Sequence, residues 1–166
     1  MSRRRRVGPP GEPLIVVDGI PLEARLSMTL LVGVTDVEMP FTFQLRDGSN
    51  DCWDFLRFVM SAVEGGRIGR DDVLVVDNAA IHGAAEMLPH LVGLLQSVGA
   101  EMVFLPTYSP EFNPCELVFG ELKGSLRQYR HPELTFRDRI THALSHIDIV
   151  NVLSYYHHCT TVALQI

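Results

Sequence analysis

The fold of this chain is decided by two stretches, residues 73–82 (VLVVDNAAIH) and residues 104–126 (FLPTYSPEFNPCELVFGELKGSL). In the first, four consecutive apolar residues predict a strand buried on both faces, and Asp77 follows directly. In the second, an apolar run leads into a proline-rich turn, after which Pro114 opens a helix with Glu116 in its first turn. Ligands gather beyond the carboxyl ends of parallel strands. The sequence therefore predicts that two carboxylates from distant parts of the chain lie at one edge of a sheet.

Asp77 and Glu116 are the predicted catalytic residues and metal ligands. Magnesium ions in proteins are held by one or two carboxylates together with phosphate oxygens of the substrate. Two such ions about 4 Å apart activate a water molecule and stabilise the leaving oxygen of a phosphodiester. Each residue also has a simpler interpretation. Asp77 can form a turn after its strand, and Glu116 can complete a capping box that Asn113 begins.

The helix that begins at Pro114 carries a basic face beside Glu116. At 100° per residue, Lys123 and Arg127 lie about 20° to either side of Glu116, and Arg130 lies about 40° away. A carboxylate followed by a basic stripe suits a metal site flanked by contacts to DNA phosphates. We therefore predict these three basic residues as DNA-binding. The core-facing side of the same helix is predicted to consist of Val118, Leu122 and Leu126.

Three further polar residues are predicted to support the two carboxylates: Asn78, His82 and Asn113. His82 can approach the same sheet edge as Asp77, although a local hydrogen bond at a helix start explains this histidine equally well. Glu121 lies about 140° from Glu116 around the helix and is predicted to be solvated. The histidines complete no known zinc-ligand spacing, and the chain has no P-loop or GxSxG motif.

The remaining elements predict a mixed α/β domain. A hairpin-like set of strands precedes a strand–helix–strand–helix order, which is typical of a sheet with helices on both faces. We interpret residues 1–13 as a basic arm rich in glycine and proline, and residues 14–166 as a single domain. Further strands are predicted at residues 14–17, 27–35, 41–45 and 102–105, and further helices at residues 51–63, 84–97 and 135–152.

The composition, 46% hydrophobic and 20% charged, is that of an ordinary soluble globular protein. No apolar run approaches the roughly 18 residues of a membrane span, so we expect no membrane partner. Three cysteines without CxxC spacing favour a reducing compartment inside the cell. The net charge of −6 is unusual for a DNA-binding protein, but local clusters set the field that DNA meets. Residues 3–6, four arginines, are either a solvated tail or an arm that contacts phosphates.

The segments DNAAIH (residues 77–82), LPTYSPEFNPCE (residues 105–116) and ELKGSLR (residues 121–127) resemble the second and third motifs of DDE-superfamily transposases of the Tc/mariner type. The resemblance implies an α/β fold of the RNase H-like, retroviral-integrase-like class, with a mixed sheet flanked by helices. It also implies that Asp77 and Glu116 are the second and third carboxylates of a catalytic triad.

The same resemblance implies a biochemical role. A member of this family cleaves DNA and transfers strands during transposition, with Mg²⁺ or Mn²⁺ as its cofactor. Its expected partners are transposon ends and target DNA, and a second copy of the chain in a homodimer is a further candidate. We expect a nuclear location in a eukaryote and a cytoplasmic one otherwise.

The first carboxylate of the triad is the open question. In the family it lies on a strand upstream of an Arg/Gly-rich segment like residues 3–11, so the resemblance implies that this strand and its aspartate are missing from the chain. Considered from the residues alone, Asp18 is the candidate, because LIVVDG (residues 14–19) mirrors VLVVDN (residues 73–78). Two functions follow: an active endonuclease, or a catalytically inactive or domesticated remnant that binds DNA or protein.

Overall fold

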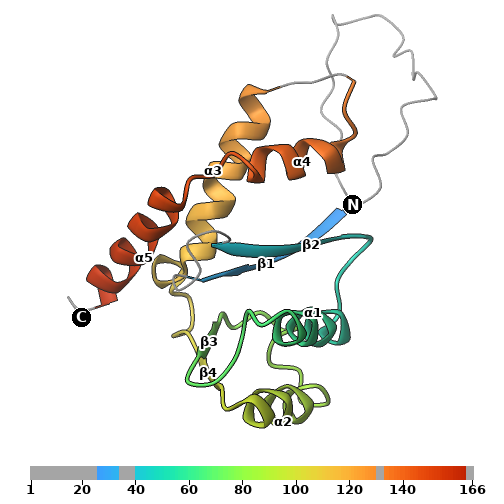
Figure 1. Ribbon diagram of the computed structural model, residues 1–166, viewed down its shortest axis with the longest axis vertical. Coiled ribbons are helices and arrows are strands. Elements are labelled where there is room, and N and C mark those ends of the chain that lie inside the picture. Colours follow the sequence, from blue (N-terminus) through green and yellow to red (C-terminus); the bar gives the residue numbers. More distant parts are fainter. Residues whose placement is uncertain (1–25, 34–39, 130–132, 164–166) are drawn as a thin grey trace, which may run out of the picture.

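The structure, a computed structural model, describes residues 26–33, 40–129 and 133–163. Two strand pairs and five α-helices make up this part of the chain (Figure 1). In chain order the elements are β1 (Leu26–Val32), β2 (Phe41–Asp47), α1 (Cys52–Glu64), β3 (Val73–Val76), α2 (Leu88–Val98), β4 (Glu101–Phe104), the 3-10 helix η1 (Pro110–Phe112), α3 (Pro114–Gln128), α4 (Phe136–Leu144) and α5 (Ile149–Ala163).

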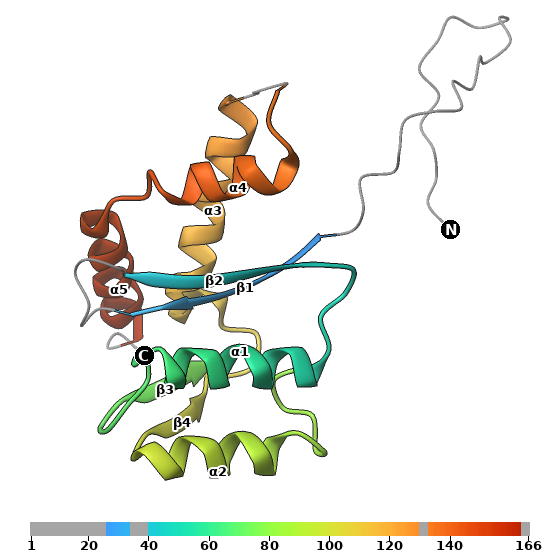
Figure 2. The same cartoon turned by 45° about the vertical axis from the view of Figure 1, so that its right-hand side comes forward.

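The strands form two separate two-stranded sheets. β1 and β2 pair antiparallel, with Leu26 opposite Asp47 and Val32 opposite Phe41. β3 and β4 pair in parallel, with Val73 beside Glu101. Figures 1 and 2 show β1–β2 between the α3–α5 group on one side and α1 on the other, with β3–β4 beside α1 and α2. The single mixed sheet that the sequence predicts is therefore divided in two within the described residues.

Each sheet has its own hydrophobic core. The first core lies between β3–β4, α1 and α2, and its most buried members are Val59, Met87, Leu91 and Leu95. The second lies between β1–β2 and the three C-terminal helices, around Val118, Leu144 and Val152. The predicted core face of α3 is confirmed at Val118 and Leu122, which are buried, while Leu126 packs at the edge of the second core.

Helix α1 is fixed at its start by a capping box and an ion-pair cluster. The Asp51 side chain accepts from the Asp54 backbone N–H (2.8 Å), and the Asp54 side chain accepts from the Asp51 N–H (3.0 Å). Asp54 is buried, and its carboxylate also pairs with Arg46 of β2 and with Arg57. A buried carboxylate is tolerated when it is paired and hydrogen-bonded, so this cluster holds the β1–β2 hairpin against α1.

The C-terminal region differs from its prediction, because the single helix expected at residues 135–152 is two helices. α4 ends at Leu144, and the Ser145 hydroxyl donates to the His142 carbonyl (2.8 Å), which closes its last turn. Asp148 then accepts from the Val150 N–H (2.9 Å) and begins α5 in the manner of an N-cap. α2 also starts later than expected, at Leu88, because residues 84–87 form a turn.

Strand β3 matches its predicted bounds, but its predicted burial on both faces is wrong. Leu74 and Val76 are buried against α1 and α2, whereas Val73 and Val75 on the opposite face are each 52% exposed. The apolar run correctly predicts a strand, but no described neighbour completely covers the face that carries Val73 and Val75.

No helix in the described part of the chain is long and apolar enough to cross a membrane. The predicted arm at residues 1–13, the predicted strand at residues 14–17 and Asp18 lie outside the described residues, as does Arg130.

Replacement of Leu91 by alanine should lower the free energy of unfolding by about 2–5 kcal/mol, because the side chain is completely buried and its loss leaves a cavity. Leu153→Ala is the matched control, since Leu153 is 44% exposed. Urea unfolding followed by circular dichroism measures both. Equal losses in the two variants would contradict the assignment of Leu91 to the core.

Candidate functional site

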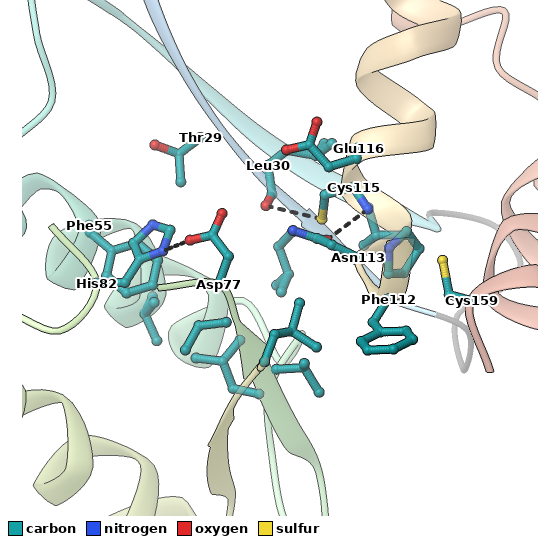
Figure 3. Close-up of a pocket in the computed structure, with 18 of the residues that line it drawn as sticks. Thr29, Leu30, Phe55, Asp77, His82, Phe112, Asn113, Cys115, Glu116 and Cys159 are labelled. Carbon is teal, nitrogen blue, oxygen red and sulfur yellow. Dashed lines mark hydrogen bonds and ion pairs between the residues drawn. The ribbon is translucent and has the colours of Figure 1, made fainter. Parts of the chain in front are cut away.

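A cavity of about 720 Å³ opens between β1, β3 and the start of α3. Its lining includes four of the predicted site residues: Asp77, His82, Asn113 and Glu116. Figure 3 shows the carboxylates of Asp77 and Glu116 on opposite sides of this space, one from the end of β3 and the other from the first turn of α3. The two carboxylates that the sequence analysis singled out thus line the same cavity.

Asp77 is held by two contacts to one of its oxygens. Its Oδ1 accepts from the Ala79 backbone N–H (3.0 Å), which forms the tight turn after β3. The same oxygen lies 2.6 Å from Nδ1 of His82. Asp77 therefore forms the predicted turn and also lies next to His82. Its other oxygen, Oδ2, accepts no hydrogen bond from any described residue.

His82 is itself held by packing. Its ring stacks at a tilt against Phe55 of α1, with 4.2 Å between ring centroids, and its side chain is only 18% exposed. A histidine fixed in this way orients the carboxylate with which it pairs. Asn78 does not line the cavity; its side chain donates to the Leu105 carbonyl and ties the end of β3 to the end of β4.

Glu116 does not cap its own helix. Asn113 is the N-cap, and its side chain accepts from the Cys115 N–H (3.0 Å). The Asn113 backbone N–H donates to the Pro110 carbonyl (3.0 Å), so the reciprocal bond of a capping box is not formed. Glu116 is exposed, and no hydrogen bond or ion pair joins its carboxylate to a described residue. The capping interpretation of Glu116 is therefore wrong in this structure.

The electrostatics of Cys115 show that both carboxylates act on the same point. Burial, the largest cause, acts together with the negative charges of Glu116 and Asp77 and raises the pKa of the Cys115 thiol to about 12. A backbone hydrogen bond at Val32 acts in the opposite direction. The thiol stays protonated at neutral pH and is no nucleophile.

Cys115 and Tyr156 are contacts that the sequence analysis missed. The Cys115 thiol donates to the Leu30 carbonyl (3.9 Å), and the Tyr156 hydroxyl donates to the Val32 carbonyl (2.9 Å). Both acceptors are main-chain groups of β1, so the sequence carried no signal for these contacts.

Asp77 and Glu116 are the acidic side chains among the described residues that line the cavity. Asp77 and Glu116 offer free carboxylate oxygens, and Mg²⁺ commonly takes one or two protein carboxylates. Within the described ranges, however, no group of three or more His, Cys, Asp or Glu side chains is arranged to hold a metal ion. A site for a pair of ions would need a further ligand.

The basic side of α3 continues from Glu116 along the helix. Lys123 and Arg127 are both exposed, and they lie about 10 and 16 Å from Glu116 along the helix axis at 1.5 Å per residue. Glu121 is not solvated as predicted, because it accepts from the Tyr155 hydroxyl (2.7 Å) and from the Asn151 side chain (3.1 Å). The far side of α3 therefore packs on α5, and the basic side faces solvent.

The sequence model of a family described as DDE superfamily endonuclease matches residues 1–137. This span contains β1 to α3 and both carboxylates. No curated protein matches the chain.

The two residues at the start of α3 should have separable effects on stability. Asn113→Ala removes the N-cap and should lower the free energy of unfolding by about 0.5–2 kcal/mol. Glu116→Gln should leave this free energy almost unchanged, because the carboxylate bonds to no described residue. Chemical denaturation of the two variants beside the unaltered chain measures the difference. A loss in Glu116→Gln as large as that in Asn113→Ala would restore the capping role of Glu116.

Proposed function

The chain belongs to the family of DDE superfamily endonucleases, and from this premise we propose that it is the catalytic domain of a Tc/mariner-type transposase. Its proposed reaction is metal-dependent cleavage and strand transfer of DNA, with Mg²⁺ or Mn²⁺ bound by Asp77 and Glu116. The proposed architecture is RNase H-like, and in a eukaryote the proposed location is the nucleus.

One observation carries this proposal: two carboxylates from distant elements meet in one cavity with free oxygens. Asp77 stands at the end of β3 and Glu116 in the first turn of α3, and both line the same space. Carboxylates on rigid elements hold a cation in a fixed position relative to a substrate. A purely structural role would predict that the Glu116 side chain bonds to its neighbours, and it bonds to none of the residues that the structure describes.

In this reaction the residues of the chain would have separate roles in holding the cation and in binding DNA. A bound divalent cation would supply charge stabilisation at the phosphodiester and a more acidic water molecule. Asp77 and Glu116 would hold this cation, and His82 would keep Asp77 in place through its Nδ1 contact. Lys123 and Arg127 would bind the phosphate backbone without reading sequence, because ammonium and guanidinium groups neutralise phosphates.

The small number of carboxylates at the cavity favours a second function, which is binding of DNA or protein without cleavage. The described residues contain two acidic ligands at the cavity and no cluster of three. A domain of this kind without its third ligand would bind DNA or protein through the same surface and would not cleave. The two functions differ in a single measurable property, the ability to nick DNA.

Supercoiled plasmid incubated with the purified chain and Mn²⁺ or Mg²⁺ should be converted to nicked circles. Asp77→Asn and Glu116→Gln should each reduce the rate at least a hundredfold, because they remove the ligands of the cation while preserving shape. Agarose gel electrophoresis over time measures the rate.

Glu111→Gln is the matched control, since Glu111 is an exposed carboxylate in η1 that does not line the cavity. Nicking that survives in both site variants would assign the activity to a contaminant and would contradict the proposed active site. Binding of DNA without nicking by the unaltered chain would establish the second function.

Lys123→Ala and Arg127→Ala should weaken DNA binding by a similar factor on unrelated sequences. Each should also reduce the slope of log affinity against log salt by about 1, because each removes one phosphate contact. Fluorescence anisotropy with labelled duplexes at several salt concentrations measures both quantities. Arg70→Ala serves as control, since Arg70 is exposed but follows α1 rather than α3. Unchanged slopes in the α3 variants would remove α3 from the interface.

A further inference from the structure

We propose that a second cavity, of about 210 Å³ between α3 and α4, binds a phosphate group and that Arg139 is its main ligand. Figures 1 and 2 show α4 lying across α3. The polar side chains that line the cavity are those of Ser125, Tyr129, Arg139, His142 and His146. This inference stands on the residues of the cavity and does not depend on the proposed nuclease activity.

The cavity lies on a different side of α3 from the predicted DNA-binding residues. At about 100° per residue, Ser125 lies about 180° from Glu116 around the helix, whereas Lys123 and Arg127 lie about 20° from it. A phosphate group in this cavity is therefore separate from the phosphates that Lys123 and Arg127 would bind. The two sites can be tested independently.

Arg139 carries a positive charge that no described carboxylate compensates. Its neighbour on the same helix, Arg137, pairs with Asp47 (3.2 Å). Arg139 instead donates from Nη2 to the Leu126 carbonyl (3.0 Å), and its guanidinium carbon lies 5.9 Å from the centroid of the Phe136 ring. A cation that is half-buried, as Arg139 is, is normally paired with an anion. The missing charge is therefore expected to come from a ligand.

The Nε–H group of Arg139 is a buried donor without an acceptor. Within the described ranges it is the buried side-chain nitrogen that lacks a hydrogen-bond partner. An unpaired buried donor costs free energy, and a bound ion or water commonly satisfies such a group. A guanidinium binds a phosphate through two parallel N–H groups. A small rotation of the Arg139 guanidinium would present Nε–H and one Nη–H to the same anion.

The other polar groups of the cavity suit an anion better than a cation. The hydroxyls of Ser125 and Tyr129 are donors, and the imidazoles of His142 and His146 are donors when protonated. No carboxylate of a described residue lines the cavity. The two imidazoles, with 4.4 Å between ring centroids, could also hold a transition metal. The charge of Arg139 in the same cavity would repel such an ion.

The size of the cavity suits one phosphate group. Its volume is several times the roughly 30 Å³ that a water molecule occupies in the liquid, so a phosphate ion fits together with a few water molecules. A DNA duplex is too wide to enter a space of this size between two helices. A free phosphate ion, a nucleotide and the phosphorylated end of a DNA strand all present the same oxygens to Arg139, and they are distinguished by testing each of them.

The first test is titration of the isotope-labelled chain with inorganic phosphate, followed through the Nε–H nuclear magnetic resonance signals of its arginines. The Arg139 signal should shift and saturate, because its Nε–H gains an acceptor. The Arg137 signal should stay in place, because this side chain already pairs with Asp47. Sodium chloride at the same ionic strength is the control ligand. Shifts of both signals that are equal and do not saturate would overturn the proposal.

Arg139→Gln should weaken phosphate binding by roughly tenfold or more, because the charge-assisted hydrogen bonds to the anion are lost. Arg137→Gln is the matched control, since Arg137 is on the same helix and does not line the cavity. Isothermal titration calorimetry with inorganic phosphate measures both affinities. Equal affinity in Arg139→Gln and the unaltered chain would overturn the proposal.

The Arg139 signal of the unaltered chain keeps the proposal testable if Arg139→Gln does not fold. The same titration is repeated with a nucleoside monophosphate and with a DNA duplex that carries either a terminal phosphate or a terminal hydroxyl. Saturation by inorganic phosphate or the nucleotide supports a free ligand, and saturation by the phosphorylated duplex alone supports a DNA end.

Two results would overturn the proposal. One is an Arg139 signal that none of these ligands moves. The other is a shift that both duplexes cause equally and that Lys123→Ala abolishes, because the phosphate would then be bound on the opposite side of α3.

Discussion

The hydrogen-bonding demand of strand edges is the constraint on which this structure depends. A buried main-chain N–H or C=O that lacks a partner costs free energy, so buried strand edges are paired, covered or solvated. β1 and β3 border a largely apolar cavity, and among the described residues each pairs with a strand on one side only. Tyr156 and Cys115 compensate part of this demand at two carbonyls of β1.

The elements that the sequence predicted well are those with local signals. Val73–Val76 has its predicted bounds because an apolar run between polar turns leaves little choice of register. The start of α3 is equally well defined, because Asn113 caps the helix and Pro114 occupies its first position. Asp77 and Glu116 stand at these two boundaries, so the element that carries each could be predicted, and the parallel pairing of β3 with β4 then brings both boundaries to one cavity.

The features that could not be predicted depend on tertiary contacts. The exposure of Val73 and Val75 reflects what covers the sheet, and the strand's own sequence does not contain this information. The pairing of Glu121 with Tyr155 requires α5 to fold back on α3. The break between α4 and α5 is local, yet Ser145 and Asp148 are tolerated within helices, so their capping role becomes evident only from the hydrogen bonds.

The division of the hydrophobic residues into two cores has a consequence for the order of folding. All buried members of the first core lie between Cys52 and Ala100. The second core joins Val32 to residues as distant as Val152. Closing a short loop costs less entropy than closing a long one, and proteins with local contacts fold faster. The α1–α2 half is therefore expected to form first during synthesis, as a template on which the hairpin and the C-terminal helices later assemble.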